Sequence, residues 1–107
     1  MESKLITQKG TCYICGCNEG YERHHCIHGA ANRKLAEKER LWVWLCRECH
    51  RRLHDKNEND DWLMAQGQKA WEKDYIKNYP YKNHAEQSAI EEFVRIFGKN
   101  YIYEESN

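Results

Sequence analysis

Short hydrophobic runs in the first half of the chain predict two β-strands. Residues 21–27 and 41–45 are rich in aromatic and β-branched side chains and have the length of strands. Residues 30–39, which lie between them, consist mainly of helix formers. Residues 46–54 place their apolar and histidine side chains at helical spacing. The pattern therefore predicts two strands separated by a helix and followed by a second helix.

Longer hydrophobic stripes in the second half of the chain predict two more helices. Residues 57–61 form a polar break, which favours the start of a helix over residues 62–76. Pro80 lies in a segment that ends this helix. Asn83 begins a sequence like a capping box, and Gly98 predicts the end of the helix that follows. The aromatic stripes on both helices are typical of core positions.

The chain is short, so the hydrophobic core that these elements can form must be small. A chain of 107 residues fits one domain, 1–107, and buries only about two thirds of its unfolded surface. The start has no export signal and no stretch could span a membrane, so we expect a cytoplasmic protein without a membrane partner. In a reducing compartment, six cysteines indicate metal ligands rather than disulfides.

Four of the cysteines form two CxxC pairs, Cys12 with Cys15 and Cys46 with Cys49. Two such pairs can surround one structural Zn²⁺, and the free energy of zinc binding, on the order of 10 kcal/mol, would offset the thin core. Cys17 is close enough to replace Cys15, but packing is the simpler interpretation of the two remaining cysteines, Cys17 and Cys26. A zinc finger built from the second pair and two histidines would leave the first pair idle.

Each CxxC pair is followed along the chain by two histidines. His24 and His25 are adjacent in a predicted strand, so their side chains point to opposite faces, and one can bind a metal while the other faces a substrate. His50 and His54 lie one helical turn apart and can reach a single ion. We expect His28 to lie on the surface or to contact a phosphate.

The order of these motifs resembles the HNH endonucleases of the ββα-metal group, and the first CxxC pair matches the branch of that family that contains a structural zinc. The resemblance covers roughly residues 12–54 and extends to small HNH proteins encoded by phages and prophages. It implies an α+β fold with a ββα-metal core over residues 10–56, stapled by a zinc site of four cysteines. Two helices in residues 57–107 would form a C-terminal extension.

The resemblance also implies a function: hydrolysis of DNA phosphodiester bonds, by nicking or by double-strand cutting. His24, His50 and His54 would hold a catalytic divalent metal, which can be Mg²⁺, Mn²⁺, Ni²⁺ or Zn²⁺. His25 would be the general base, a role that suits an imidazole near neutral pH. DNA is the expected partner, and phage packaging proteins are further partners to test.

The chain departs from the family at the middle Asn, whose position is occupied by Arg40 or Leu41. Asn32 is the only asparagine between the two histidine motifs, so it is the candidate to orient His25. The alternative for Asn32 is a capping or surface role.

Charge is uneven along a chain whose net charge is zero. Residues 23–56 carry nine basic and four acidic side chains, so a basic face around the histidines is expected. Candidate phosphate contacts are Arg33, Lys34, Arg47, Arg51 and Arg52. A solvated surface is the alternative for these residues. For the chain as a whole, the alternative function is a non-catalytic zinc-stabilised module that binds DNA or protein.

Overall fold

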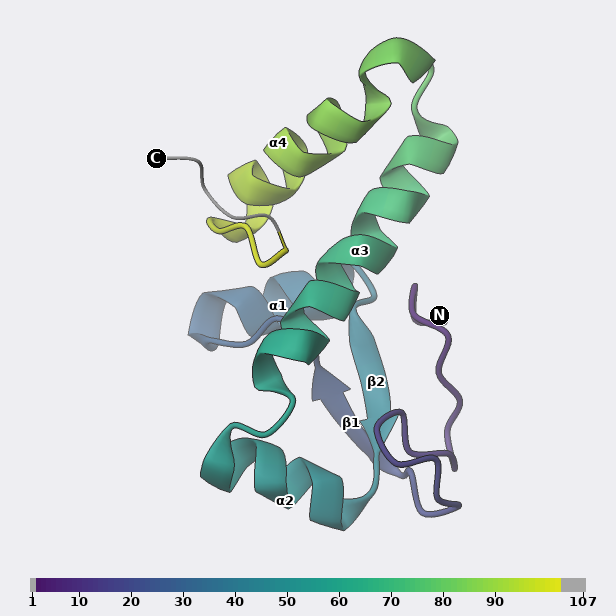
Figure 1. The fold of residues 1–107 in the computed structure, drawn as a ribbon, viewed down its shortest axis with the longest axis vertical. Coiled ribbons are helices and arrows are strands. Elements are labelled where there is room, and N and C mark those ends of the chain that lie inside the picture. The colour runs from purple at the N-terminus through teal and green to yellow at the C-terminus, as the bar shows by residue number, and fades with distance from the viewer. Residues whose placement is uncertain (1, 103–107) are drawn as a thin grey trace.

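A computed structural model describes residues 2–102, so the last five residues of the predicted extension lie outside the described range. The elements in order are β1 (Glu22–His25), α1 (Ala30–Lys38), β2 (Trp42–Leu45), α2 (Arg47–Lys56), α3 (Asp60–Asn78), η1 (Lys82–His84) and α4 (Ala85–Phe97). The predicted α+β class is confirmed: the described residues form one two-stranded sheet and four α-helices (Figure 1). None of these helices combines the length and apolarity needed to cross a bilayer.

The antiparallel register of β1 and β2 gives the sheet two different faces. His24 pairs with Val43 and His25 pairs with Trp42, so successive residues of β1 alternate between the faces. His24 and Val43 lie on the inner face, where Val43 is fully buried in the hydrophobic core with Leu53 of α2. The other face, called the outer face below, carries Arg23, His25, Trp42 and Trp44.

The helices α3 and α4 form a hairpin that continues the core beyond the sheet (Figure 1). Trp71 of α3 contacts Phe93 of α4 with ring centroids 5.6 Å apart, and Phe93 stacks on Phe97 at 4.6 Å. Gly98 adopts φ 82° at the end of α4, as predicted for a left-handed stop. Phe93 and Phe97 belong to the same buried cluster as Val43 of the sheet.

The boundaries of the two C-terminal helices differ from those predicted. The helix α3 already begins at Asp60, because two aspartates in its first turn favour the positive end of the helix dipole. Asn83 is not the cap of α4: it lies within η1, and His84 precedes the first residue of α4 without a side-chain cap bond. A short 3-10 turn therefore replaces the expected capping box.

Candidate metal centres

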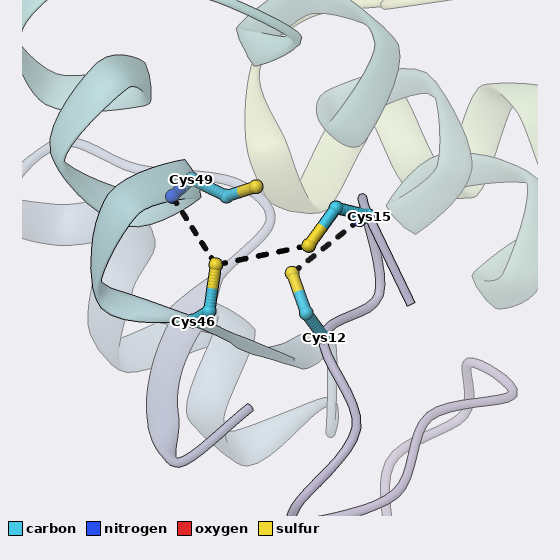
Figure 2. Close-up of side chains that lie close together, drawn as sticks. All are labelled: Cys12, Cys15, Cys46 and Cys49. Atoms are coloured by element: carbon cyan, nitrogen blue, oxygen red, sulfur yellow. Dashed lines mark hydrogen bonds between the residues drawn. The ribbon is translucent and has the colours of Figure 1, made fainter. Parts of the chain in front are cut away.

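Four cysteine sulfurs from two distant segments point toward one another (Figure 2). Cys12 and Cys15 lie in the N-terminal loop, Cys46 caps α2, and Cys49 lies in its first turn. The Sγ atoms of Cys15 and Cys46 are 3.8 Å apart. Two sulfurs of a tetrahedral Zn²⁺ site, each about 2.3 Å from the ion, are separated by about the same distance. These four cysteines can therefore hold a structural metal such as zinc.

Both CxxC turns have the same local hydrogen bond: the backbone N–H of the second cysteine donates to the sulfur of the first. The distances are 3.5 Å from Cys15 to Cys12 and 3.4 Å from Cys49 to Cys46. Burial acts to raise the pKa of Cys12, but the backbone N–H donors around its sulfur outweigh it and lower that pKa to about 6. Burial and the neighbouring thiols raise the pKa of Cys49. A thiolate at one cysteine thus disfavours ionisation of the next, so all four thiols can ionise together only when a cation is bound.

The two remaining cysteines do not belong to this cluster of four ligands. Cys26 is fully buried, and that burial raises the pKa of its thiol to about 12, as expected for packing. A Cβ added at Gly67 would lie 2.8 Å from the Cβ of Cys26, so α3 approaches the chain closely just after β1. Cys17 is partly exposed and packs against the core.

A second cluster consists of His24 on β1 with His50 and His54 on α2, as the sequence predicted. One ring nitrogen from each lies within 4.8 Å of the others, and the Nε2 atoms of His50 and His54 are 2.9 Å apart. His24 is 5% exposed, and its Nε2 has no hydrogen-bond partner among the described residues. Burial, followed by the neighbouring His50, lowers the pKa of His24 to about 3, so its ring is neutral at pH 7.

This histidine cluster fits a divalent transition metal. Nitrogens bound to one ion at about 2.1 Å lie at most about 4.2 Å apart, so small ring rotations suffice to close the site. Glu22 on β1 supports the arrangement, because its Oε1 lies 2.6 Å from Nδ1 of His50 and leaves Nε2 of His50 facing the cluster. Metal-binding histidines commonly donate their second ring N–H to a carboxylate in this way.

His25 lies on the outer face and contacts an acidic residue that the sequence pattern did not single out. Its Nε2 is 2.6 Å from Oε2 of Glu37 on α1, and the other oxygen of Glu37 accepts from Arg23 at 2.6 Å. The hydrogen bond from His25, with the charge of Arg23, lowers the pKa of Glu37. No hydrogen bond joins Asn32 to His25 among the described residues. The side chain that contacts His25 directly in this structure is that of Glu37.

The predicted phosphate contacts fall into two groups. Arg51 and Arg52 both pair with Glu48 on the exposed side of α2, and Arg51 also contacts Asp55. The positive charges of Arg51 and Arg52 are therefore partly balanced. Exposed ion pairs of this kind contribute at most about 1 kcal/mol to the free energy of unfolding. Three others make no ion pair within residues 2–102 and are exposed: Arg33, Lys34 and Arg47.

His28 is exposed, but it is not a bare surface residue. Its Nε2 lies 2.9 Å from Oδ1 of Asp60, the first residue of α3. The contact joins the segment after β1 to the start of the C-terminal hairpin. His28 therefore has a structural partner, which neither of the roles considered from the sequence included.

We expect about one tightly held zinc ion per chain, bound by the four cysteines. Cys46→Ser should lose that zinc and much of its stability, because zinc binding on the order of 10 kcal/mol is comparable to the total stability of a small domain. Metal analysis with circular dichroism measures both effects. Cys17→Ser is the matched control and should keep its zinc; loss of zinc in Cys17→Ser would make Cys17 a ligand.

We also expect protein that already carries zinc at its cysteines to bind Ni²⁺ at the histidine cluster. Calorimetric titration should show that Glu22→Gln weakens Ni²⁺ binding by about 10–100-fold, the usual effect of losing a supporting partner, and that His54→Ala weakens it further. His84→Ala, at an exposed histidine on another helix, is the control. Equal affinities for His54→Ala and the unchanged protein would exclude this metal site.

Comparison with known proteins identifies no relative of this chain. A scan against models of protein families, a search of curated proteins and a search of solved structures found no match. The function is therefore inferred from the two clusters and from the resemblance of the motifs to HNH nucleases.

Proposed function

We propose that this chain is a metal-dependent DNA endonuclease of the HNH kind, which hydrolyses phosphodiester bonds with His25 as the general base. The observation that carries the proposal is the buried His24, whose Nε2 has no partner among the described residues and which has a ring nitrogen within 4.8 Å of ring nitrogens of His50 and His54. An unsatisfied buried polar atom costs about 1–3 kcal/mol. A bound ion would remove that cost.

The alternative is a zinc-stabilised module that binds DNA or protein without catalysis. Such a module needs the four cysteines, but it has no use for three converging imidazoles supported by Glu22. It also leaves the buried nitrogen of His24 unexplained. The histidine cluster therefore favours the nuclease.

The metal ligands would be His24, His50 and His54, and the candidate ions are Mg²⁺, Mn²⁺, Ni²⁺ and Zn²⁺. When bound, a divalent ion supplies positive charge that stabilises the phosphate and the leaving 3′ oxygen as negative charge develops. Products with 5′-phosphate and 3′-hydroxyl ends are expected from the resemblance.

His25 would take a proton from the attacking water. Because the carboxylate of Glu37 accepts from Nε2 of His25, the ring proton belongs on Nε2 and the lone pair on Nδ1. Nδ1 is thus the nitrogen that can accept the proton of the water. Glu37 then stabilises the imidazolium that forms and fixes the orientation of the ring.

The test of the proposed function is the conversion of supercoiled plasmid to nicked or linear DNA with Mg²⁺, Mn²⁺ or Ni²⁺. We expect His25→Ala to cut about 10²–10⁴ times more slowly than the unchanged protein, because it lacks the general base. His84→Ala is the control at equal zinc content. Intact plasmid with every metal would contradict the nuclease, and equal cutting by His25→Ala would contradict the role of His25.

A second test concerns Glu37. We expect Glu37→Gln to lower kcat about tenfold with little change in KM, because a neutral amide loses the charge assistance that strengthens the hydrogen bond to His25 as it gains a proton. Glu37→Asp should recover part of the rate. Glu86→Gln, at an exposed glutamate on α4, is the control. If Glu37→Gln raised kcat instead, Glu37 would restrain His25 rather than assist it.

A further inference from the structure

The N-terminal segment forms one wall of a groove beside the outer face. Residues 3–7 follow the free edge of β2: the Oγ of Ser3 donates to the carbonyl of Trp42 at 2.6 Å, and the N–H of Trp44 donates to Oγ1 of Thr7 at 3.1 Å. Between this segment and the sheet lies an open hollow of about 780 Å³, lined in part by Arg23, Trp42 and Trp44. This hollow is called the outer-face groove below.

Cations and indole rings alternate along the groove. The guanidinium of Arg23 lies 4.0 Å from the ring centroid of Trp42 and 5.4 Å from that of Trp44, and the amine of Lys9 lies 5.5 Å from the same Trp44 ring. Lys9 is exposed and Trp44 is partly exposed, so both are accessible. Among the described residues that line the groove, Glu2 is the one acidic side chain.

The groove is continuous with the candidate catalytic residue. Arg23 and His25 occupy alternate positions on one face of β1, which places them about 7 Å apart along the strand. Glu37 joins them directly, because each of its carboxylate oxygens contacts one of the two side chains. A nucleic-acid strand with its scissile phosphate at His25 would thus have the cations of the groove next to it.

We propose that the outer-face groove binds a single-stranded stretch of the DNA substrate beside the cleavage site, with a base stacked on Trp44 and phosphates facing Lys9 and Arg23. Aromatic platforms flanked by cations are how proteins bind single strands, and a duplex does not offer its base faces to such a ring. This inference rests on the proposed function for the identity of the substrate. It adds that the enzyme selects DNA with an unpaired segment.

The test is the affinity for a fluorescently labelled single strand and for a duplex of the same sequence, measured by anisotropy. The full chain carrying one zinc ion per chain is used without added divalent metal, and gel electrophoresis checks that the DNA stays uncut. We expect tighter binding of the single strand. Trp44→Leu should weaken it about fivefold or more. Lys9→Gln should weaken it and also lower the slope of log affinity against log salt by about 0.7, as expected for the loss of one phosphate contact.

Lys69→Gln is the matched control, because Lys69 is an exposed lysine of α3 that does not line the groove. Lys9 is itself exposed, so Lys9→Gln tests the groove even if Trp44→Leu fails to fold. The inference is overturned if Lys9→Gln binds the single strand as tightly as the unchanged protein, or if duplex and single strand bind equally. If the protein still cuts plasmid in that case, the proposed nuclease function stands. Binding that depends on Lys9 in a protein that cuts no DNA supports the groove and contradicts the proposed function.

Discussion

The four-thiol cluster is the constraint on which the rest of this small structure depends. It ties the N-terminal loop to the first turn of α2, where Cys46 is the cap residue and accepts from the backbone of Cys49. His50 follows Cys49 directly and His54 lies one turn later, so the cluster that positions the helix also positions two of the histidines. With zinc bound, a free energy on the order of 10 kcal/mol would hold this arrangement, which is comparable to the total stability of a small domain.

The pleat of β1 then separates two kinds of chemistry. Glu22 and His24 alternate with Arg23 and His25, so the first two face α2 and the last two lie on the outer face. On the inner face His24 is buried and its ring is neutral, which suits a metal ligand. On the outer face the side chain of His25 is partly exposed, which suits a base that must meet water and a phosphate. One strand of four residues can thus serve both roles without placing its two histidines side by side.

Much of this arrangement was predictable, because it depends on local patterns. The CxxC pairs, the helical spacing of His50 and His54 and the positions of the two strands are visible over a few residues. The role of Glu37 was not, because it depends on how α1 packs against β1. Glu37 and Glu39 look alike in the same helix-forming run, yet Glu37 contacts His25 whereas Glu39 accepts from the indole of Trp71. Asn32 was singled out as the only asparagine between the two histidine motifs, and residue type alone carries no information about such packing.

The shared carboxylate of Glu37 has an electrostatic consequence for the proposed mechanism. A carboxylate paired with His25 alone would place its whole negative charge beside that ring. Arg23 contacts the same carboxylate at 2.6 Å, so the negative charge of Glu37 is shared between Arg23 and His25. Arg23 is held in place by Trp42, whose ring centroid lies 4.0 Å from its guanidinium. The tryptophans of the outer face therefore help to position Arg23. In the proposed mechanism, a ligand that moves Arg23 within the groove would change the charge beside His25.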